Sequence, residues 1–152
     1  MVEILAPTLT PTSLEVRYRF KASRERLFEA WTKPAALKQW FRVHPSYSTP
    51  IAEIDLQVGG HYRLGMQTPE GELLVAAGEY RQIEQPRKLS FTWAWEHAPA
   101  DSLPTLVTVE ISDFDGGTEV VLRHEAFISE EQRDSHLQGW QGCFEQLIHI
   151  QK

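Results

Sequence analysis

The feature that most constrains this chain is a change of hydrophobic period near residue 129. Before it, apolar residues recur at every second position in several short runs, which places alternate side chains on one face of a β-strand. After Ser129 the spacing becomes helical, with an apolar stripe formed by Leu137, Trp140, Phe144 and Leu147. The sequence therefore predicts antiparallel strands followed by a long helix over residues 129–152.

Seven runs fit the strand pattern, and two short helices interrupt them. In the first strand, Leu14, Val16 and Tyr18 alternate with charged residues. Ser23 is placed to cap a short helix, and Pro34 suits the first turn of a second one. Gly, Pro and Asp clusters mark the turns between the later runs. The predicted strands cover residues 14–21, 51–56, 62–66, 73–83, 89–95, 107–111 and 120–124.

A single helix cannot cover a flat sheet of six or seven strands, so the sheet is expected to curve around it. Such curvature leaves an internal space between sheet and helix. The predicted fold class is therefore α+β of the helix-grip type, a curved antiparallel six- to seven-stranded sheet around a long C-terminal helix. A chain of 152 residues fits one domain, residues 1–152, with residues 1–12 expected to be flexible.

Composition and charge exclude several classes of protein. The formal net charge of -6 disfavours binding to nucleic acid and to anionic membranes. The sequence contains no apolar run of about 18 residues, so no membrane span is expected. Glu3 and Pro7 do not fit a signal peptide, and the lone Cys143 cannot form an intramolecular disulfide. We therefore expect a cytoplasmic protein.

The most informative candidate site is an aromatic face on the predicted strand 89–95. Phe91, Trp93 and Trp95 occupy alternate positions and must share one side of the sheet. A pocket built on them would accept a flat apolar ligand, whereas the same side chains would otherwise fill a core. The predicted cavity-lining residues are Tyr62, Met66, Tyr80, Phe91, Trp93, Trp95, His124, Trp140 and Phe144.

Signals for catalysis or cofactors are weak. His124 shares a strand face with Val120 and Leu122. An imidazole there could donate a hydrogen bond to a ligand or act as an acid/base group, or it could simply be a hydrogen-bonded core residue. The six histidines lack metal-ligand spacing, so no metal and no other cofactor is predicted. Cys143 has no identifiable base and is expected to pack as an inert thiol. No catalytic residue is assigned.

Several motifs resemble one protein family. They occur in the family's order and span residues 14–152: FEAWTKPAALKQWF at 28–41, DLQVGGHYR at 55–63, GEY at 78–80, PRKLSFTW at 86–93 and GW at 139–140. This pattern is similar to the SRPBCC, or START-like, superfamily, and more narrowly to the branch named after the activator of heat-shock protein 90 ATPase. The resemblance implies the same helix-grip fold. Members of the superfamily have functions that range from lipid carriage to polyketide cyclisation.

Three functional hypotheses follow. The first is binding of a small hydrophobic ligand, lipid-like or aromatic, between the sheet and the C-terminal helix, without catalysis as the main role. The second is a co-chaperone or stress-related role, in which the outer surface and residues 31–41 contact a chaperone. The third is a cyclase or aromatase in which His124, Tyr62 and Tyr80 act as acid/base groups.

Overall fold

A computed structural model describes residues 3–150 and contains one strongly curved sheet with three helices. The chain runs through β1 (Glu3–Ile4), β2 (Thr8–Thr10), β3 (Ser13–Phe20), α1 (Arg24–Thr32), α2 (Pro34–Trp40), β4 (Ser48–Ile54), β5 (His61–Gln67), β6 (Leu73–Glu84), β7 (Lys88–Trp95), β8 (Thr105–Phe114), β9 (Gly117–Glu125) and α3 (Glu130–Ile150). The predicted α+β helix-grip architecture is confirmed.

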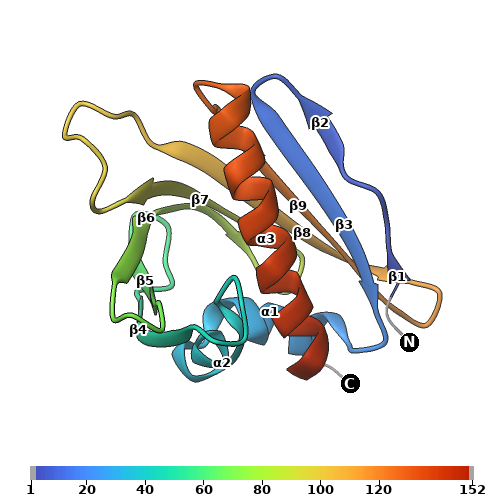
Figure 1. The fold of residues 1–152 in the computed structure, drawn as a ribbon. Coiled ribbons are helices and arrows are strands. Elements are labelled where there is room, and N and C mark those ends of the chain that lie inside the picture. Colours follow the sequence, from blue (N-terminus) through green and yellow to red (C-terminus); the bar gives the residue numbers. More distant parts are fainter. Residues whose placement is uncertain (1–2, 151–152) are drawn as a thin grey trace.

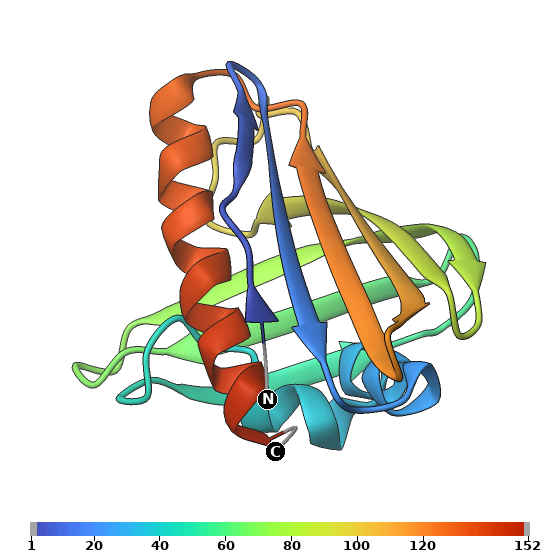
Figure 2. The same ribbon diagram turned by 90° about the vertical axis from the view of Figure 1, so that its right-hand side faces the viewer.

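All strand pairs are antiparallel, in the order β1-β3-β9-β8-β7-β6-β5-β4. The sheet bends around α3, which crosses its concave face, while α1 and α2 lie at one end (Figure 1). Figure 2 shows that β5 to β7 run at a wide angle to β3 and β9. The curvature expected from one helix facing many strands is therefore present.

Local sequence signals explain where the helices begin. The Ser23 hydroxyl accepts a hydrogen bond from the Arg26 amide at 3.2 Å, and Pro34 occupies the first turn of α2. At the start of α3, Ser129 Oγ accepts from the Gln132 amide at 3.0 Å. The Gln132 side chain in turn accepts from the Ile128 amide at 2.9 Å. This exchange is close to a capping box and fixes the start of α3.

Within residues 3–150 the sheet has nine strands, because residues 3–10 contribute two that the sequence did not predict. β1 and β2 pair in succession with β3, so residues 3–10 of the N-terminal lead include two short strands. Residues 1 and 2 of that lead lie outside the described residues. Both strands are exposed along their whole length, and an edge strand without a buried face shows no hydrophobic alternation. The paired backbone, and not the side chains, defines these strands.

The core fills the space between the concave face, α3 and the two short helices. Leu14, Val16, Tyr18 and Phe20 are buried on alternate positions of β3, as the period predicted. The Trp40 indole nitrogen donates to the Ala30 carbonyl at 2.8 Å and ties α2 to α1. Within residues 3–150, no helix is both long and apolar enough to cross a membrane.

Candidate ligand cavity

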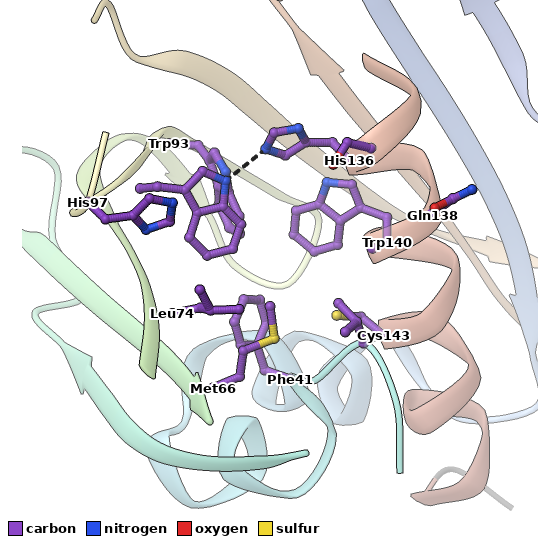
Figure 3. A pocket seen from close by; sticks show the side chains of 13 residues that line it. Phe41, Met66, Leu74, Trp93, His97, His136, Gln138, Trp140 and Cys143 are labelled. Carbon is purple, nitrogen blue, oxygen red and sulfur yellow. Dashed lines mark hydrogen bonds between the residues drawn. The ribbon is translucent and has the colours of Figure 1, made fainter. Parts of the chain in front are cut away.

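A cavity of about 480 Å³ lies between β7 and the middle of α3 (Figure 3). Its volume falls in the range of roughly 300–1,000 Å³ that is usual for small-molecule sites. The walls come from the α2–β4 connection, β5, β6, β7, the following loop and α3. The lining residues are Phe41, Val43, Met66, Leu74, Trp93, Trp95, His97, Ser135, His136, Gln138, Gly139, Trp140 and Cys143.

Aromatic rings form the upper part of the cavity. Trp93 meets Trp95 edge-on, with ring centroids 5.4 Å apart, and lies 5.2 Å from Trp140 of α3. The imidazole of His97 stacks on Trp95 at 5.7 Å with an interplanar angle of 29°. Trp93 and Trp140 are buried, Trp95 is half-buried and His97 is exposed at the rim. The cavity therefore has a buried indole wall on its inner side and faces solvent at the edge beside His97.

Two histidines connect the indole wall to its surroundings. The Trp95 indole nitrogen donates to His136 Nε2 at 3.1 Å, which leaves His136 Nδ1 to donate to the Gln132 carbonyl at 2.8 Å. This arrangement requires one neutral tautomer of the imidazole. Burial lowers the pKa of His136, and the hydrogen bond to Gln132 opposes that shift. The side chain is therefore held as a neutral acceptor for Trp95.

The second histidine lies deeper and makes a complete chain of hydrogen bonds. The Trp140 indole nitrogen donates to His124 Nδ1 at 3.0 Å, so His124 Nε2 carries the proton that faces Thr105 Oγ1 at 2.7 Å. The Thr105 hydroxyl then donates to the Trp93 carbonyl at 3.1 Å. Burial, followed by the charge of His136, lowers the pKa of His124 well below its ordinary value. His124 is a hydrogen-bonded core histidine.

The predicted site residues separate into two groups in the structure. Met66, Trp93, Trp95 and Trp140 line the cavity. Tyr62, Tyr80 and Phe91 instead pack against one another, with centroid distances of 5.2–6.0 Å, around a void of only about 10 Å³. A void of that size holds at most about one water molecule, so this part of the aromatic face is a filled core.

Two other predicted residues do not reach the cavity. His124 is covered by its own hydrogen-bond partners, and Phe144 stacks on Tyr18 at 4.2 Å in the core. The Tyr62 hydroxyl donates to the Thr92 carbonyl at 2.6 Å. Burial raises the pKa of both Tyr62 and Tyr80. The three residues considered for acid/base chemistry thus lie outside the cavity walls.

The sequence reasoning missed much of the α3 wall. His136, Gly139, Trp140 and Cys143 follow one another at helical spacing and face the cavity together. Only Trp140 was assigned to the site, although the period that placed it also places its neighbours three and four positions away. Burial raises the pKa of the Cys143 thiol to about 12, which agrees with the expected inert packing role. Phe41, Val43, Leu74 and His97 come from distant segments and carried no local signal.

The two glycines of α3 have different reasons to be there. A Cβ atom at Gly142 would lie 2.1 Å from the Val43 carbonyl oxygen, so the backbone of the α2–β4 connection occupies that space. A Cβ atom at Gly139 would meet only Val43 Cγ1, at an ordinary 3.5 Å. Gly142 permits close packing of two backbones, whereas Gly139 leaves open space at the cavity wall.

The family model described as "Activator of Hsp90 ATPase homolog 1-like protein" matches residues 21–151. The chain belongs to this family. Family membership and the helix-grip fold together confirm the resemblance found in the sequence motifs. Among curated proteins, none matches the chain.

Solved structures agree with the fold. Protein Ms6760 from Mycobacterium smegmatis superposes with a TM-score of 0.84 at 19% identity, covering 99% of this chain and 98% of that one. A protein from Rhodobacter sphaeroides gives 0.81 at 24% identity, with coverage of 99% and 97%. CalU16 from Micromonospora echinospora gives 0.68 at 25% identity, covering 97% of this chain and 83% of that one. Likeness at such identity describes shape and not activity.

Proposed function

We propose that this family member binds a small hydrophobic molecule in the cavity between β7 and α3. The observation that carries the proposal is a space of about 480 Å³ walled by Phe41, Met66, Trp93, Trp95 and Trp140. Apolar and aromatic walls with a few polar groups at one edge are typical of ligand sites. The SRPBCC fold commonly binds hydrophobic ligands, which supports the proposal.

The test is a thermal-shift screen of the purified protein against fatty acids, sterols, flavonoids and polyketides. A ligand present at one hundred times its dissociation constant adds about 2.7 kcal/mol to the free energy of unfolding. For a protein of this size the midpoint then rises by roughly 5–11 °C. Quenching of tryptophan fluorescence gives a second readout, because three of the wall residues are indoles.

Gly139→Leu tests whether a hit occupies the cavity. A Cβ atom at this position meets no backbone, and the rest of a leucine side chain would take up space at the cavity wall, so binding is expected to fall by more than tenfold. Gln141→Leu is the matched control, because Gln141 is exposed on the same helix and does not line the cavity. Equal affinity of both variants, or a screen without any hit, would refute the proposal.

A co-chaperone role is the second candidate, and the family's description favours it. The large apolar side chains of the region considered for chaperone contact, Trp31, Leu37, Trp40 and Phe41, are buried in the core. Contact with a chaperone would therefore use the polar surface of α1 and α2. Absence of binding and of ATPase stimulation with purified heat-shock protein 90 would remove this candidate.

A further inference from the structure

We infer that the cavity selects uncharged, ring-containing molecules over carboxylates and over straight acyl chains. This inference rests on the proposed function and narrows its ligand class. Two observations carry it: the absence of ionic side chains from the walls, and the concentration of flat rings around one end of the space. Each observation is tested by comparing the binding of its own pair of matched probe molecules.

Among the described residues, the walls offer a charged ligand no carboxylate, ammonium or guanidinium partner, and their polar side chains are those of His97, Ser135, His136 and Gln138. Among the described residues that line the cavity, none is Asp, Glu, Lys or Arg, although these four types make up 24% of the chain. An ionised group moved from water into such a site loses hydration and gains no counter-ion. The net charge of -6 adds an unfavourable field for anions. A neutral ligand avoids both costs.

Two of the three indole N–H groups of the wall are already engaged. The Trp95 N–H is directed to His136, and the Trp140 N–H is directed to His124. His136 uses its remaining nitrogen on the Gln132 carbonyl. The Trp93 N–H is buried and has no hydrogen-bond partner among the described residues. Besides ring faces and edges, the wall therefore holds one unpaired neutral donor, which a neutral acceptor such as a carbonyl oxygen can satisfy without a charge. A further polar group of the ligand is best accommodated at the rim beside exposed His97.

The ring geometry favours a flat occupant. Trp93, Trp95, Trp140 and His97 line the cavity from β7, α3 and the β7–β8 loop. Figure 3 shows Trp93, His97 and Trp140 grouped around the same space. A planar ring can pair with such walls in stacked or edge-to-face arrangements. A straight acyl chain gains only dispersion contacts there and loses more rotational freedom on binding.

The charge comparison uses acetylnaphthalene and naphthoate, which have nearly the same shape and differ in charge. Binding is measured by isothermal titration calorimetry in mildly alkaline buffer, where free imidazoles are neutral. We expect acetylnaphthalene to bind at least about tenfold more tightly. His97→Arg places a cation at the exposed rim and should raise the affinity for naphthoate relative to that for acetylnaphthalene about fivefold. Naphthoate binding as tightly as acetylnaphthalene to the unaltered protein would overturn the charge argument.

The ring comparison uses acetylnaphthalene and methyl decyl ketone, which have the same number of carbon atoms. The aromatic ketone is expected to bind about fivefold more tightly, and Trp95→Leu should remove that advantage. Phe114→Leu is the control, because Phe114 is a partly exposed ring on the β8–β9 hairpin, outside the cavity. An advantage that survives Trp95→Leu, or a preference for the acyl ketone, would overturn the ring argument.

The outcomes separate the two proposals. Tighter binding of naphthoate or methyl decyl ketone, abolished by Gly139→Leu, would leave the cavity as a binding site and overturn only the selectivity. Failure of all three probes to bind, together with a screen without any hit, would refute binding of small hydrophobic molecules and the selectivity together.

Discussion

Alanine substitution at the two glycines of α3 gives a paired test of the packing. Gly139 and Gly142 lie three positions apart in the same helix, so replacing either by alanine removes the same helix penalty of about 1 kcal/mol. The contacts differ: the new Cβ would lie 3.5 Å from Val43 Cγ1 in one variant and 2.1 Å from the Val43 carbonyl oxygen in the other. Only the second distance requires the backbone to move.

The magnitude follows from this difference. Gly139→Ala should stabilise the protein by about 1 kcal/mol, because the new Cβ makes no clash that would oppose the gain in helix propensity. Gly142→Ala gains the same amount and loses about 1–3 kcal/mol to overpacking against the α2–β4 connection. The gain in helix propensity is the same in both variants. Gly142→Ala should therefore be less stable than Gly139→Ala by about 1–3 kcal/mol.

The assay is urea unfolding followed by circular dichroism, with thermal unfolding as a second measurement. A difference of about 2 kcal/mol corresponds to roughly 4–8 °C in the midpoint for a chain of this length. The slope of the urea transition should stay the same, because neither change alters the surface exposed on unfolding. Equal stability of the two variants would refute the close approach of α3 to Val43.

Three further predictions concern the buried polar groups. Trp140→Phe leaves His124 Nδ1 without its donor and should lower the free energy of unfolding by about 1–3 kcal/mol in urea titrations, and an unchanged midpoint would contradict the hydrogen bond. Burial lowers the pKa of His124 and His136, so below about pH 6.5 the unfolded chain binds more protons and stability falls with decreasing pH. His136→Gln should reduce the dependence of the thermal unfolding midpoint on pH. A pH dependence identical to that of the unaltered protein would exclude His136 as one of its causes. Because burial raises the Cys143 pKa to about 12, a disulfide reagent should label this thiol only as urea unfolds the chain, and rapid labelling of the native protein would contradict its buried position.

The sequence by itself determined the fold class. Alternating apolar residues on β3 and the aromatic run of β7 specify strands with one buried face, and the capping residues Ser23 and Ser129 mark where helices begin. These signals are local, since each depends on residues within a few positions of one another. The edge strands β1 and β2 were not predicted from the sequence, because their side chains are exposed and only their backbone is paired.

Tertiary structure decided which aromatic residues line a cavity and which fill the core. Phe91 and Trp93 occupy the same face of β7, yet Phe91 packs against Tyr62 and Tyr80 while Trp93 also borders the open space. That distinction depends on how far α3 lies from each part of the curved sheet. Strand period fixes the face on which a side chain lies, and the distance between packed elements determines whether a space remains beside it.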